Sequence, residues 1–85
     1  MEENKDPQLN IELDQEVAEG TYSNLAIINH SVAELIVDFN NIMPGVPKAK
    51  VKSRIILTPQ HAKRLTKALA ENVRKFEQAH GEIKD

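Results

Sequence analysis

The sequence lacks cysteine and tryptophan altogether and has only three glycines among its 85 residues. Without cysteine there are no disulfides, thiolate metal ligands or thiol nucleophiles. Three isolated glycines exclude a glycine-rich phosphate loop. No apolar run is long enough to span a bilayer, and the acidic start, MEENKDP, lacks the apolar segment of a signal peptide. We therefore expect a cytoplasmic protein that makes no membrane contact.

Side chains suited to catalysis or metal binding are scattered along the chain. His30, His61 and His80 show none of the short spacings typical of metal ligands. The serines lack the glycine-flanked context of a hydrolase nucleophile. We expect a protein that is not an enzyme and that has no cofactor, metal or small-molecule substrate.

The net charge of −2 conceals a strong asymmetry along the chain. Residues 1–43 hold nine acids and one lysine, whereas residues 44–75 hold nine of the eleven Lys and Arg and a single acid. Such asymmetry indicates either a charged partner or neutralisation between segments within the fold.

The hydrophobic pattern predicts one domain over residues 8–83, preceded by a disordered polar tail at residues 1–7. Four segments alternate or are rich in β-branched residues, which is typical of strands. They are QLNIEL (8–13), TYSNLAIINH (21–30), AELIVDFN (33–40) and KAKVKSRIILT (48–58). Short connections between successive strands favour an antiparallel meander.

The C-terminal part predicts a long amphipathic helix. Thr58 suits the N-cap and Pro59 the first helical position, while Gly81 provides a stop after about Ala79. Apolar residues fall on one stripe of this helix: Ala62, Leu65, Leu69, Val73 and Phe76. The expected fold is α+β, a four-stranded antiparallel sheet with this helix packed on one face.

Cations recur at every second position in the fourth predicted strand. An extended chain directs Val51, Ser53, Ile55 and Leu57 to the core and the cations to the other face. Further cations lie on the polar side of the helix. The predicted basic binding surface comprises Lys50, Lys52, Arg54, Lys63, Arg64 and Lys67.

Three interpretations of these cations remain open. They dock an acidic protein surface, or they contact the phosphates of a nucleic acid. In the third, the strand cations pair with Glu12, Glu34 and Asp38 inside the fold. The shortage of aromatic residues, 4% of the chain, argues against a reader of single-stranded bases.

Apolar residues are also expected on the face of the sheet away from the helix. Ile36 and Ile56 point outward, together with either Leu25 and Ile27 or Ala26 and Ile28. Burial of such a cluster favours association, so we expect a homodimer that pairs outer sheet faces or edges.

Four segments, YSNLAIINHS, AELIVDF, MPGVPKAKVKSRIILTPQHAKRL and ALAENVRKFE, resemble a bacterial family of short proteins classed as a domain of unknown function. The resemblance covers residues 8–83, and it brings no catalytic or binding residue with it. Some members are encoded beside a large subunit of RNA polymerase, so the resemblance implies binding associated with transcription.

Overall fold

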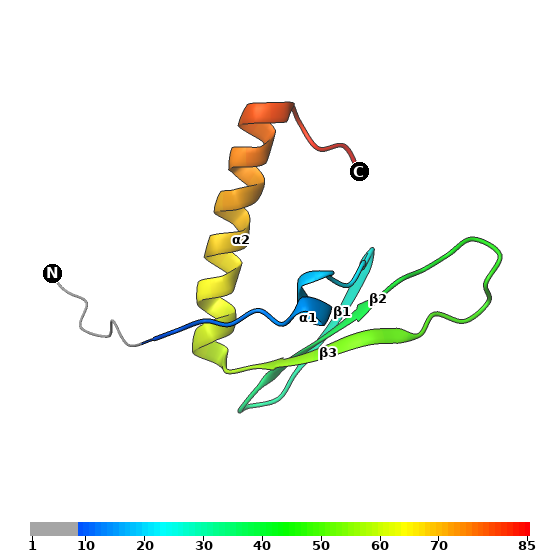
Figure 1. The fold of residues 1–85 in the computed structure, drawn as a ribbon, viewed down its shortest axis with the longest axis horizontal. Coiled ribbons are helices and arrows are strands. Elements are labelled where there is room, and N and C mark those ends of the chain that lie inside the picture. The colour runs from blue at the N-terminus through cyan, green and yellow to red at the C-terminus, as the bar shows by residue number, and fades with distance from the viewer. Residues whose placement is uncertain (1–8) are drawn as a thin grey trace, which may run out of the picture.

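The computed structural model describes residues 9–85. It contains a short helix α1 (Gln15–Ala18), strands β1 (Leu25–His30), β2 (Leu35–Asn40) and β3 (Val51–Leu57), and the long helix α2 (Pro59–His80) (Figure 1). The predicted α+β class and the long C-terminal helix are confirmed. The predicted disordered tail, residues 1–7, lies outside the described residues.

The three strands form an antiparallel meander in the order β1-β2-β3. Asp38 in the central strand is paired with Ile27 on β1 and with Arg54 on β3. A tight turn joins β1 to β2, because the Ser31 hydroxyl accepts hydrogen bonds from the backbone N–H groups of Ala33 and Glu34. The β2–β3 connection is longer and projects away from the sheet (Figure 1).

The fourth strand predicted at residues 8–13 is wrong for the part that the structure describes. Residues 9–13, here called the N-terminal arm, are not in a strand. Leu9, Ile11 and Leu13 are 73%, 86% and 68% exposed. Alternation identifies a segment suited to a sheet surface, but a strand also needs a neighbour for its N–H and C=O groups. The structure of the single chain provides no such neighbour for residues 9–13.

Alternation along the strands gives the sheet two distinct faces. The inner face, which borders α2, comprises Ala26, Ile28, Leu35, Val37, Phe39, Ile55 and Leu57. The side chains between them form the outer face, which includes Leu25, Ile27, Ile36, Asp38, Arg54 and Ile56. Of the two pairs that the sequence left open, Leu25 and Ile27 therefore join the outer face.

The predicted start and stop of α2 are confirmed. The Thr58 hydroxyl accepts a hydrogen bond from the N–H of His61 at 3.1 Å, and Pro59 occupies the first turn. Gly81 ends the helix with φ of +98°, a value that favours glycine. The helix rises from the end of β3 and extends beyond the sheet (Figure 1).

The core of the single chain is small. Val37 and Leu57 are the only apolar side chains classed as buried among residues 9–85. The apolar stripe of α2 is largely uncovered, since Leu69 is 61% and Phe76 52% exposed. Much of the apolar surface that normally holds such a fold together thus faces solvent in one copy.

Candidate binding surfaces

The strand cations lie on the outer face of the sheet or just before it. Lys52 and Arg54 alternate with Ser53 and Ile55, which line clefts on the inner face. Lys50 comes immediately before β3, in the connection from β2. All three cations are exposed. The predicted orientation of Lys52 and Arg54 is thereby confirmed.

Arg54 is engaged in a bidentate ion pair with Asp38. Its Nε donates to Oδ1 at 2.7 Å and its Nη2 donates to Oδ2 at 2.8 Å. The Asp38 side chain is only 10% exposed, whereas that of Arg54 is 60% exposed. The hydrogen bonds from the Arg54 guanidinium hold the pKa of the Asp38 carboxyl below its ordinary value. Pairing within the fold is therefore the correct interpretation for Arg54.

The helix cations lie on the other side of the molecule. Ala62, Leu65, Thr66 and Leu69 line the cleft against the inner face. At 3.6 residues per turn, Arg64 and Lys67 lie nearly opposite these residues, and Lys63 lies on the flank. All three cations are exposed. The six predicted cations thus form two groups on opposite sides of the sheet, rather than one strand–helix surface.

The helix cations are poorly neutralised along their own element. No acid occurs between residues 59 and 70, and the first turn contains none. Further along, Arg74 pairs with Glu71. Lys63 and Lys67 are spaced i, i+4, a like-charge arrangement that mildly destabilises a helix. The N-terminal half of α2 therefore carries a local positive charge that adds to the positive end of the helix dipole.

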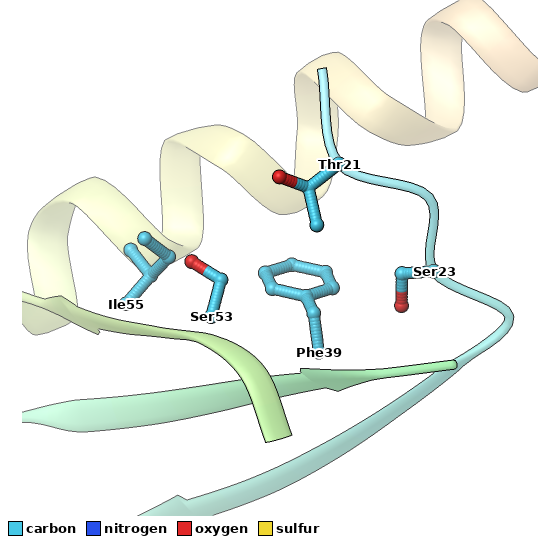
Figure 2. Close-up of a pocket in the computed structure, with 5 residues that line it drawn as sticks. All are labelled: Thr21, Ser23, Phe39, Ser53 and Ile55. Carbon is cyan, nitrogen blue, oxygen red and sulfur yellow. The ribbon is translucent and has the colours of Figure 1, made fainter. Parts of the chain in front are cut away.

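Two open clefts mark the inner face. One of about 240 Å³ lies between the sheet and α2 and is lined almost entirely by apolar residues. A second, of about 390 Å³, surrounds the Phe39 ring and is bordered by Thr21, Ser23, Ser53 and Ile55 (Figure 2). None of these five side chains is ionisable. Both clefts suit apolar side chains of another segment.

A polar clasp that the sequence analysis missed fixes the end of the sheet. Asn24 Oδ1 accepts from the N–H of Ile42 at 2.8 Å, and its Nδ2 donates to the Ile42 carbonyl at 2.9 Å. The Ser23 hydroxyl donates to the carbonyl of Asn40, whose own side chain is buried. The sequence analysis placed both residues within the predicted strand at 21–30, because a partner 18 positions away leaves no local pattern.

His30 is the last residue of β1, whereas His61 and His80 lie in the first and last turns of α2. His80 stacks obliquely on Phe76, with ring centroids 4.8 Å apart. Within the part of the chain that the structure describes, no group of three potential metal ligands converges. No helix in residues 9–85 combines the length and apolar character needed to cross a bilayer.

The chain belongs to a family described as protein of unknown function (DUF3467), whose model matches residues 1–85. The resemblance to an uncharacterised family is thereby confirmed. Comparison with curated proteins and with solved structures gives no match.

Proposed function

We propose that the protein is a non-enzymatic cytoplasmic interaction module that docks on an acidic protein surface through the N-terminal half of α2. Lys63, Arg64 and Lys67 make the contact. The single observation that carries this proposal is their position: they are exposed, directed away from the cleft and without an acid between residues 59 and 70. Of the strand cations, Arg54 is already committed to Asp38, which makes that group a poorer docking surface.

The energetic cost of placing these cations on one helix also supports their role in docking. Three cations near the positive end of a helix dipole, two of them at a repulsive spacing, reduce helix stability slightly. A sequence that retains such a local conflict is expected to gain from it elsewhere, and an anionic partner supplies that gain. The link to transcription implied by the family resemblance is part of this proposal.

An acidic protein is favoured over a nucleic acid for two reasons. The chain as a whole is acidic, with nine acids in residues 1–43, so an extended polyanion is repelled by much of the molecule. Tyr22 is the only tyrosine, and Phe39 is engaged in the inner face, which leaves little surface for stacking on bases. Binding of phosphates by the same helix cations is the alternative function.

Fluorescence anisotropy with three labelled probes tests the proposal: a polyglutamate peptide, a DNA oligonucleotide and an RNA oligonucleotide. We expect the peptide to bind most tightly, with an affinity that falls as salt is raised. The triple variant Lys63→Gln, Arg64→Gln, Lys67→Gln should abolish this binding. A matched control, Arg74→Gln, Lys75→Gln, Lys84→Gln, removes the same charge from the C-terminal half of α2 and the segment after it, and should retain the binding.

Each contrary outcome is informative. Tighter binding of an oligonucleotide, lost in the same triple variant, would establish the alternative function. Equal losses in the triple variant and its control would show that net charge, and not this helix surface, attracts the probe. Circular dichroism of both variants confirms that the helix itself is retained.

A further inference from the structure

The N-terminal arm has the features of a strand whose neighbour is missing. Leu9, Ile11 and Leu13 alternate with polar residues, yet all three side chains are mostly exposed. Exposing three large aliphatic side chains forgoes the favourable free energy of their burial. An alternating apolar segment of this kind is stabilised when it adds to the edge of a sheet.

Strand β3 offers such an edge. It has one neighbour, β2, in the sheet formed by residues 9–85. Edge strands commonly carry lysine because the charge discourages pairing with other strands. Lys52 serves this purpose here, and Lys48 and Lys50 extend the charge into the preceding connection. Such a charged edge favours an acidic strand over a neutral or basic one.

The arm and β3 match on both faces at once. Placing Leu9 and Ile11 antiparallel to β3, beside Ile55 and Ser53, continues the inner face. Because both segments alternate with a period of two, the same placement sets Glu12 on the outer face with Lys52. The other edge strand, β1 (LAIINH), contains no lysine or arginine and lacks this complementarity.

We infer that the N-terminal arm of one copy adds as a fourth strand to the β3 edge of a second copy, and that the exchange is reciprocal. Two equivalent contacts of this kind close a two-fold dimer. The acidic first half and the basic second half of the sequence then neutralise each other between chains. This inference is independent of the helix-surface binding proposed above.

The arm of the same copy is a poorer occupant of the edge. It leads through α1 into β1, which is at the opposite side of the sheet. A fourth strand beside β3 lies about 15 Å from β1 at the usual strand spacing. The connection would have to cross the inner face, where α2 borders the cleft, or the outer face with its Asp38–Arg54 pair. Figure 1 shows the arm extending on the side away from the β2–β3 connection.

The accessible surface area of the chain also indicates that it binds a partner. The chain exposes 7794 Å², whereas a compact monomer of this size exposes about 5,100 Å². Residues 1–8 lie outside the described residues. Even a fully extended segment of that length accounts for at most about 1,400 Å² of this surface. The remaining excess, about 1,300 Å², exceeds the roughly 800 Å² that each partner buries in a standard interface.

Site-specific cross-linking tests the inference. Because the native chain has no cysteine, the cross-linker reacts only at the cysteines that are introduced. Asn10→Cys protein and mass-tagged Lys52→Cys protein are refolded together from denaturant and treated with a short bismaleimide. We expect a cross-linked product containing one chain of each kind. The control replaces Lys52→Cys with Arg74→Cys, on the exposed part of α2, and should give only background cross-linking.

Two results would overturn the inference. One is a yield of mixed product no higher than that of the control. The other is a double variant, Asn10→Cys with Lys52→Cys in one chain, that cross-links only within itself at every protein concentration. That product would show the arm closing on its own sheet.

A charge exchange provides a second test by sedimentation equilibrium. Glu12→Lys or Lys52→Glu alone places like charges opposite each other and should weaken the dimer about five-fold per contact. Since the symmetric dimer has two contacts, the dissociation constant rises about 25-fold. The double variant should recover most of the affinity. Additive weakening in the double variant would contradict the pairing of these two residues.

Discussion

Asp38 and Arg54 face each other across the central and edge strands, and the guanidinium binds both oxygens of one carboxylate. The pair lies on the outer face next to Ile36 and Ile56, which are themselves partners in the register of β2 and β3. A bidentate contact accepts a narrow range of geometries. A slip of β3 by one residue would move Arg54 to the inner face and leave Asp38 without its cation. The pair therefore selects the register of these two strands.

Stability should depend on the ionisation of Asp38 in acid. Its pKa in the folded protein is below the ordinary value of 3.8, because the ionised form accepts hydrogen bonds from Arg54. The stabilisation is therefore nearly complete above about pH 5 and is lost as the pH falls through the lower pKa of the folded state. We will see the effect in the free energy of unfolding of the native protein, measured with urea from pH 7 to pH 2.5. It should decline at the acid end of this series, where Asp38 becomes protonated.

Asp38→Asn should lower stability at pH 7 and flatten this acid decline, since the titrating group is gone. Asp14→Asn is the matched control, because Asp14 precedes α1 without a side-chain capping hydrogen bond. Its pH profile should follow that of the native protein. An unchanged acid decline in Asp38→Asn would assign the effect to other carboxylates.

The extent to which sequence predicted this fold depends on how local each determinant is. Thr58, Pro59 and Gly81 act within one helical turn, so both ends of α2 were predicted. Alternation likewise assigned Val37 and Ile55 to one face and Arg54 to the other, because it is a property of each strand alone. The pairing of Arg54 with Asp38 appeared only as one of three alternatives, since it depends on a register between strands.

What sequence could not supply was the partner of each element. The alternation of Leu9, Ile11 and Leu13 predicts a strand, but a strand exists only when a neighbour accepts its hydrogen bonds. Likewise, the cations on β3 and on α2 seemed one surface because they are close in sequence. The sheet lies between them, and sequence separation contains no information about which side of a sheet a helix covers.

The Asn24 clasp should contribute measurably to stability. Asn24→Ala removes both hydrogen bonds to Ile42, and we expect a loss of about 1 kcal/mol, because a net contribution of about 0.5–1.5 kcal/mol per bond is typical and this site is exposed. Urea unfolding measures it. Asn24→Asp keeps the acceptor for the Ile42 N–H and should lose less; equal losses would show that the acceptor is unimportant.

The helix cap joins β3 to α2 through Thr58. Thr58→Ala leaves the N–H of His61 without its side-chain acceptor, and we expect a loss of about 1 kcal/mol. Thr58→Ser keeps the hydroxyl and should preserve most of the stability. Urea unfolding followed by circular dichroism at 222 nm measures both. A serine variant as unstable as the alanine variant would indicate that the methyl group, and not the hydroxyl, stabilises this junction.

Unfolding of the native protein should depend on its concentration. Val37 and Leu57 are the only apolar side chains classed as buried in residues 9–85, and the stripe of α2 from Leu65 to Phe76 remains largely exposed. A core of this size does not offset the conformational entropy of a folded chain of 85 residues. Association supplies the missing burial, and folding then becomes coupled to dimerisation.

A hundredfold increase in protein concentration should raise the free energy of unfolding by about 1.4 kcal/mol per chain, half of the value for the dimer. Urea midpoints measured at the two concentrations check this directly. Coincident midpoints would show that one copy folds alone and that the exposed apolar stripe is not covered by a second.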